Sequence, residues 1–151
     1  MRRNAHNLIV CLFLTLISTQ VFANDVIGQV KALSGNASIE RADLTVSAKL
    51  GMPVFQMDKI TTGKKGAIGL LFHDDSRLSL GPDSTMSLES FSFNKKTHDG
   101  NFDVAMKRGT LSVISGKLTA RKPGSLKVRT PAAILAVRGT EFSVKVDAPA
   151  D

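Results

Sequence analysis

The sequence predicts an all-β fold, and three observations support that prediction. Apolar residues alternate with other residues at a period of two in five short segments. Residues typical of turns separate these segments at short intervals. No segment after residue 24 carries the i, i+3, i+4, i+7 apolar stripe of an amphipathic helix. We expect a small β-solenoid-like pair of sheets, with a β-sandwich as the alternative.

The alternating segments are expected to be strands with one row of side chains in the core and the other in water. They are residues 67–72, 77–80, 102–107, 126–129 and 141–146. Between Leu88 and Phe91 the apolar row changes parity, which predicts a bulge or bend. Residues 132–137 are the only candidate for a helical turn or two, and Pro131 disfavours a longer helix there.

A short internal repeat is the reason for expecting stacked coils. Arg108-Gly109-Thr110 recurs as Arg138-Gly139-Thr140, and a β-like run follows each copy. A fixed offset between similar strands is typical of a solenoid. Two copies of a tripeptide also arise by chance, so the sandwich remains open.

The N-terminus has the three regions of a cleavable signal peptide, which we place at residues 1–23. Arg2 and Arg3 precede an apolar run over residues 8–17, and Val21-Phe22-Ala23 supplies the cleavage site. The apolar run is shorter than the roughly 20 residues that span a bilayer, so we expect no transmembrane anchor. An uncleaved, membrane-dipping N-terminus is the alternative. The expected location is the periplasm or the outside of a bacterial cell.

The remaining residues, 24–151, are expected to form one domain around a single core. The only cysteine, Cys11, leaves with the signal peptide, so the mature chain has no disulfide. Removing Arg2 and Arg3 from the 20 basic residues leaves 18 against 13 acids, a net charge of +5.

Three blocks in order resemble the FecR family over about residues 58–146. Asp58-Lys59-Ile60-Thr61-Thr62-Gly63 resembles the family's G-D-x-I-x-T-G opening. Residues 67–81, with Asp74 and Ser76, resemble its A-x-L-x-F-x-D-G-S block, although Asp75 stands where glycine is usual. Residues 128–144 are similar to V-x-T-P-x-A-x-x-x-V-R-G-T-x-F-x-V, and the matching residues there include Thr130, Pro131, Arg138, Gly139, Thr140 and Phe142.

The resemblance implies an all-β envelope module that senses or assists signalling by binding a protein partner. The best-known members are membrane-anchored regulators of an extracytoplasmic sigma factor. This chain begins with a signal peptide instead, so that role does not carry over. The family defines no catalytic residues, and its motif residues are expected to be structural here.

We expect no enzyme, because the sequence lacks the common nucleophile, zinc-protease and phosphate-loop motifs. No metal or cofactor is expected. His73 and Asp75 would share a face if extended, but a hydrophilic turn is the favoured interpretation, and His98-Asp99-Gly100 is interpreted in the same way. The mature chain has no Trp or Tyr, and its Phe residues fit core positions, which argues against nucleic acid as a partner.

Paired basic residues lie beside the predicted turns. If the turns share one edge, these residues would form a positive surface for lipopolysaccharide or another polyanion, a role that is the alternative to protein binding. Solvated turns and lysines that protect sheet edges from aggregation are the favoured explanation of such residues. The pairs considered are Lys64, Lys65, Lys95, Lys96, Lys107, Arg108, Arg121 and Lys122.

Overall fold

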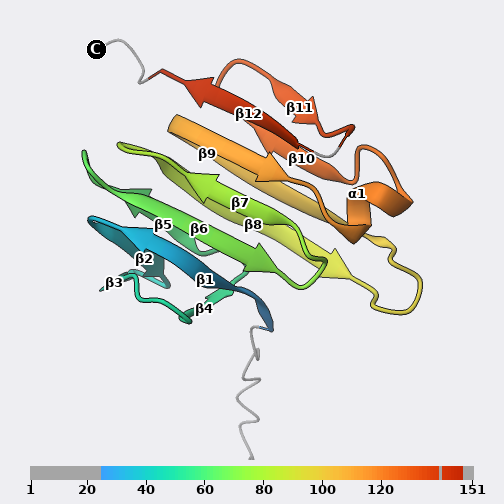
Figure 1. The fold of residues 1–151 in the computed structure, drawn as a ribbon, viewed down its shortest axis with the longest axis horizontal. Coiled ribbons are helices and arrows are strands. Elements are labelled where there is room, and N and C mark those ends of the chain that lie inside the picture. The colour runs from blue at the N-terminus through green and yellow to red at the C-terminus, as the bar shows by residue number, and fades with distance from the viewer. Residues whose placement is uncertain (1–24, 140, 148–151) are drawn as a thin grey trace, which may run out of the picture.

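The structure is a computed structural model that describes residues 25–139 and 141–147. Strands dominate it, which confirms the all-β prediction (Figure 1). The predicted signal peptide and Thr140 lie outside the described residues. In chain order the elements are β1 Val26–Ser34, β2 Ala37–Arg41, β3 Leu44–Ser47, β4 Pro53–Phe55, β5 Lys59–Thr62, β6 Ala67–Phe72, β7 Arg77–Leu80, β8 Thr85–Phe93, β9 Gly100–Ile114, α1 Lys117–Arg121, β10 Leu126–Arg129, β11 Ile134–Ala136 and β12 Glu141–Val146.

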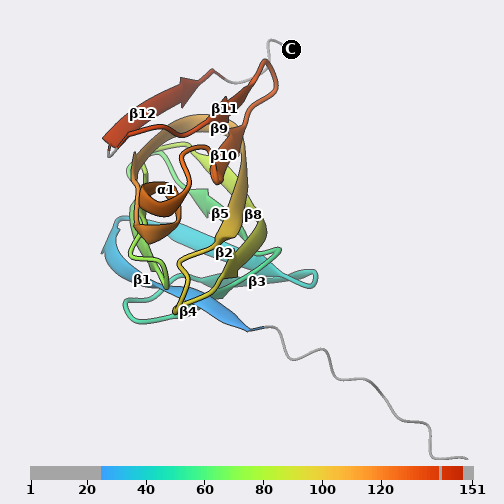
Figure 2. The ribbon, with the colours of Figure 1, turned by 90° about the vertical axis from the view of Figure 1, so that its right-hand side faces the viewer.

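The strands form one curled sheet in the order β3-β2-β5-β8-β9-β7-β6-β1-β4, with β10, β11 and β12 attached around β9. Figure 2 shows the sheet curving around an interior, with β1 and β2 at one side and β9 to β12 at the other. The two predicted sheets are present as two flanks of this curled sheet. One flank holds β4, β1, β6, β7 and β12, and the other holds β3, β2, β5, β8, β10 and β11.

The long strand β9 belongs to both flanks. Its first part, up to Arg108, pairs with β8 and β10, and its second part, from Gly109, pairs with β7 and β12. Gly109 has a φ of +95° at the change of flank, and a Cβ there would lie 2.1 Å from the Ser84 Oγ atom. Only glycine fits this bend, which explains the first Arg-Gly-Thr copy.

The strand pairing differs from that of stacked coils. Of the eleven pairings between described strands, ten are antiparallel. Short turns connect successive strands, and such turns return the chain antiparallel to itself. The strand after the second Arg-Gly-Thr copy, β12, runs antiparallel to the second part of β9, with Glu141 opposite Ile114 and Val146 opposite Gly109. The first copy lies within β9 and the second precedes β12, so the segments that follow the two copies are antiparallel neighbours and not stacked parallel coils.

The single described helix is not where the sequence suggested one. Residues 134–136 form β11, and the helical turn is α1, which belongs to the connection between β9 and β10. Among the described strands these two form the one parallel pair, which requires a longer crossover than a hairpin turn. With five residues, α1 is too short to show a periodic apolar pattern. The bulge predicted between Leu88 and Phe91 is confirmed, because the β8–β9 register shifts between Leu88 and Ser90.

The alternating apolar residues fill the interior as predicted. Phe72 and Phe102 are buried, and their ring centroids lie 4.6 Å apart, with Phe91 at 5.0 Å from Phe102. Such tilted aromatic contacts add to the stability gained by burial. The other large, fully enclosed side chains are Ile39, Ile60, Ile68, Leu70, Leu78, Leu80, Met86, Leu88, Met106 and Leu111.

Candidate interaction surfaces

Asp58, the first motif residue, is a buried anchor. Its Oδ1 and Oδ2 atoms accept hydrogen bonds from Nε and Nη2 of Arg41, both at 2.7 Å, and Oδ2 also accepts from the backbone N–H of Phe55 at 2.9 Å. The guanidinium lies 4.1 Å from the centre of the Phe55 ring. The hydrogen bond to Asp58 raises the pKa of Arg41 above its ordinary value. The pair ties β2 to the segment between β4 and β5.

Thr62 and Gly63 secure the neighbouring turns. The buried Thr62 hydroxyl donates to the Gly81 carbonyl at 2.7 Å and accepts from the Ser84 N–H at 2.9 Å. Gly63 donates its N–H to the Asn36 carbonyl at 2.9 Å and accepts from Asp83 N–H at 3.1 Å. Both residues thus hold the backbone of other loops.

Asp74 and Ser76 anchor the turn between β6 and β7. Both are buried, and the Ser76 hydroxyl donates to Asp74 Oδ2 at 2.5 Å while accepting from the Gly116 N–H at 3.0 Å. Between them Asp75 has a φ of +68°, so the turn accepts a non-glycine residue as expected. The exposed Asp75 carboxylate contacts Lys117 Nζ at 2.7 Å. The turn is thereby fastened to the start of α1.

The last motif block lies at the surface. The Thr130 hydroxyl accepts from Ala133 N–H at 3.0 Å and closes the loop between β10 and β11, which includes the exposed Pro131. Arg138 and Gly139 are exposed, and Phe142 on β12 is half-buried against the core. This loop and β12 enclose an open, largely apolar hollow of about 380 Å³, lined by Thr130, Pro131, Ala132, Ala133, Leu135, Val144, Lys145, Val146 and Asp147.

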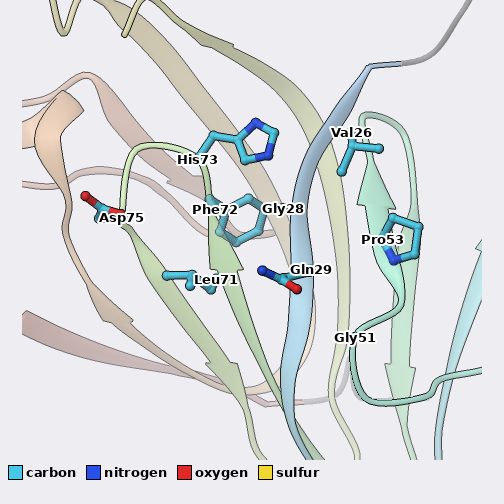
Figure 3. A pocket seen from close by; sticks show the side chains of 9 residues that line it. All are labelled: Val26, Gly28, Gln29, Gly51, Pro53, Leu71, Phe72, His73 and Asp75. Carbon is cyan, nitrogen blue, oxygen red and sulfur yellow. The ribbon is translucent and has the colours of Figure 1, made fainter.

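A second hollow, of about 410 Å³, lies between the start of β1, β4 and the β6–β7 turn (Figure 3). His73 is exposed beside it, and the Asp75 side chain points away from His73. No three His, Cys, Asp or Glu side chains within residues 25–139 and 141–147 are placed to hold a metal ion. His98, in the other turn predicted from the sequence, has a φ of +60° and stacks on Phe93.

The predicted basic residues occupy opposite parts of the molecule. Lys64 and Lys65 are in the turn between β5 and β6, and Lys64 shares a shallow hollow of about 750 Å³ with Arg108. The β8–β9 loop with Lys95 and Lys96 lies at the same end as α1, where Figure 1 shows the loop in yellow and the helix in orange. Arg121 joins that loop through Asp99, with Nε 3.6 Å from Oδ1, and Lys122 follows α1. Two of the four basic pairs, Lys95-Lys96 and Arg121-Lys122, therefore share one end.

A set of exposed apolar residues, distinct from the two flanks of the curled sheet and called the apolar flank below, was not found by motif reasoning. It consists of Leu44, Val46, Leu50 and Met57, whose side chains are 44–73% exposed. All four come from the stretch that includes β3 and β4, and β3 is an edge strand with every residue exposed. Leu44 and Val46 lie on one side of β3, because side chains two apart in a strand share a face, and exposed large apolar side chains grouped in this way are typical of protein interaction sites.

Two further residues were missed because their roles depend on long-range packing. Arg41 lies 17 residues from Asp58, and nothing in the local sequence links them. Gly116 approaches the β6–β7 turn so closely that a Cβ would lie 2.1 Å from the Asp74 carbonyl oxygen. The signals in the sequence were an arginine after a glutamate, Glu40-Arg41, and an isolated glycine, which are both common.

The fold and these contacts define an all-β module in which the motif residues within the described ranges mainly secure turns. The part of the chain that the structure describes contains no helix with the length and hydropathy of a membrane span. The family described as FecR protein matches residues 58–150, more than half of the sequence. The chain therefore belongs to the FecR family, a family of signalling and regulatory domains, as the resemblance predicted.

No curated protein matches the chain. A solved structure described as a cell surface anchoring domain is 27% identical over 40% of this chain and 82% of that chain, with a TM-score of 0.39. The folded unit begins before the family match, because β1, β2 and β4 contribute the buried residues Val30, Ile39 and Val54. Membership of the family supports an envelope-associated module.

Proposed function

We propose that this protein is an exported, non-catalytic module of the bacterial cell envelope that binds a protein partner and acts as a sensor or accessory in envelope signalling. Residues 1–23 would direct export to the periplasm or the cell exterior, and residues 24–151 would form a single domain. Family membership supports the signalling context. The turn-anchoring roles of Asp58, Thr62, Asp74 and Ser76 support a structural use of the motif rather than a chemical one.

The exposed apolar flank is the observation that carries the proposal. On the edge strand β3, Leu44 is 70% and Val46 44% exposed, and Leu50 and Met57, in the following stretch of the chain, are 67% and 73% exposed. Leaving such side chains in water forgoes about 1.5–3 kcal/mol for each residue that a partner could bury. A protein surface with its own apolar patch would cover this flank and contact the β3 edge.

Affinity capture from envelope extracts tests the proposal. The tagged chain should retain a specific protein at moderate salt, and a Leu44→Ser, Val46→Ser variant should lose it. Ile134→Ser is a matched control, because Ile134 is 64% exposed on β11, away from the flank. The proposal fails if no protein is retained at moderate salt. If the unchanged chain and both variants captured the same protein equally, the binding surface would lie outside the apolar flank.

The alternative function is binding of an anionic envelope polymer such as lipopolysaccharide. Its support is the placement of Lys95, Lys96, Arg121 and Lys122 at the α1 end of the molecule, although Asp99 offsets part of that charge. Binding of this kind should weaken as salt rises, because exposed charges are screened. Retention of polyanions alone, lost at moderate salt and in a Lys95→Glu, Lys96→Glu variant, would favour the alternative.

A further inference from the structure

Strand β12 has an unpaired edge. Among the described residues it pairs with β9 on one side only, and it is attached outside the main path of the sheet. Its six residues make it longer than the other exposed edge strands, since β3 has four and β4 and β11 have three each. An open edge of this length offers backbone N–H and C=O groups to another strand.

The charges on β12 are arranged for pairing with a copy of itself. The strand reads Glu141-Phe142-Ser143-Val144-Lys145-Val146, with Glu141, Ser143 and Lys145 in the exposed row. In an antiparallel pair centred on Ser143, Glu141 of each copy lies opposite Lys145 of the other. A parallel pair in register would instead place like charges side by side, which is unfavourable. The present contact of Lys145 with Asp147, at 3.6 Å, joins two highly exposed groups and is weak.

The apolar side chains of β12 are also partly exposed to solvent. Phe142, Val144 and Val146 are only half-buried, and Val144 and Val146 border the apolar hollow that opens beside Leu135. In the same antiparallel register, Phe142 of one copy lies opposite Val144 of the other. The apolar pairs would therefore form on the face that is now partly open to water.

We propose that two copies of this chain associate through β12, antiparallel and centred on Ser143, so that one flank of each curled sheet continues into the other. The contact is isologous, as expected for a closed two-fold dimer. The other edge strands carry no such charge pattern, because β3 and β11 have no charged residue to fix a register and β4 begins with Pro53. The apolar flank near β3 remains free for a different partner, so this inference does not rest on the proposed function.

Reversal of charge tests the register. The full chain, purified after export and any processing by the cell, should form a concentration-dependent dimer in sedimentation experiments. Glu141→Lys and Lys145→Glu should each weaken the dimer about tenfold or more, because each change creates two like-charge pairs. The double variant restores both opposite-charge pairs and should dimerise again. Lys31→Glu on β1, an interior strand, is the matched control and should leave the dimer unchanged.

Cysteine cross-linking provides a second, independent readout. Ser143→Cys places two thiols opposite each other at the two-fold axis, where the Cα separation of about 4.5–5.5 Å in paired antiparallel strands permits a disulfide. It should give a covalent dimer under mild oxidation, whereas Ser79→Cys on the interior strand β7 should not. A monomer at all concentrations would overturn the proposal. So would a dimer insensitive to both charge variants, or cross-linking equal for the two cysteine variants.

Discussion

Asp58 and Arg41 form a bidentate ion pair in which the carboxylate is completely buried and the guanidinium is 35% exposed. The pair brings together a residue of the family motif and an arginine that precedes the family match. Because an isolated buried carboxylate is strongly disfavoured, Asp58 depends on this partner from β2. The N-terminal strands are therefore part of the same stable unit as the motif.

The first prediction concerns the loss of that partner. Arg41→Ala should lower the free energy of unfolding by about 2–4 kcal/mol, since Asp58 would stay buried without its countercharge. Urea unfolding followed by circular dichroism measures the change. Glu40→Gln is the control, because it breaks the exposed Lys59–Glu40 pair and should cost less than about 1 kcal/mol. Similar losses in both variants would show that Asp58 does not need Arg41.

The second prediction concerns the hydroxyl of Thr62. Thr62→Val keeps the shape of the side chain but removes the acceptor for Ser84 N–H and the donor to the Gly81 carbonyl. We expect a loss of about 1–3 kcal/mol in the free energy of unfolding, the usual cost of an unsatisfied buried group. Thr61→Val, at the half-exposed neighbouring position, should change stability far less. A stabilised Thr62→Val variant would contradict the anchoring role.

The strands were predictable from the sequence where local pattern decides the structure. The alternation in residues 67–72 and 141–146 reflects a sheet with one buried face, and the bulge near Ser90 follows from the change in parity. The positive φ at Asp75 follows from the turn sequence. In each case a few neighbouring residues carry the whole signal.

The arrangement of the strands and surfaces depends on contacts between distant residues. Pairing of β1 with both β4 and β6 and the close approach of Gly116 to Asp74 join positions far apart in the chain. The grouping of the basic pairs was equally unpredictable from local sequence, because it depends on which turns lie at the same end of the molecule. The solenoid-like expectation rested on the Arg-Gly-Thr repeat, and the second copy proved to precede an antiparallel neighbour of β9.

The third prediction concerns pH. The hydrogen bond and then the positive charge of Lys117 lower the pKa of Asp75 from its ordinary value of 3.8. The stabilisation from this pair is thus fully present above pH 3.8 and is lost as the pH falls through the lowered pKa of the folded state. NMR titration of the Asp75 carboxyl carbon should show the lowered pKa in the native chain. Lys117→Gln should return it toward 3.8, whereas Lys122→Gln should not. An unchanged titration in Lys117→Gln would contradict the assignment.

The fourth prediction separates two glycines with different surroundings. At Gly116 a Cβ would lie 2.1 Å from the Asp74 carbonyl oxygen and 2.4 Å from the Ser76 nitrogen, both rigid backbone atoms. Gly116→Ala should therefore displace the β6–β7 turn from the start of α1 and lower the free energy of unfolding by about 2–3 kcal/mol. At the motif residue Gly63, the nearest atom to a Cβ is 3.6 Å away, an ordinary contact.

Gly63→Ala should accordingly change the free energy of unfolding by less than about 1 kcal/mol, and the reduced freedom of the unfolded chain offsets part of any cost. Thermal and urea unfolding of the two variants in parallel provide the comparison. Backbone amide shifts of residues 73–76 should move in Gly116→Ala and stay in place in Gly63→Ala. If Gly63→Ala proved the more damaging of the two, the motif glycine would have a role beyond the turn it forms, and the contact of Gly116 with the β6–β7 turn would not limit stability.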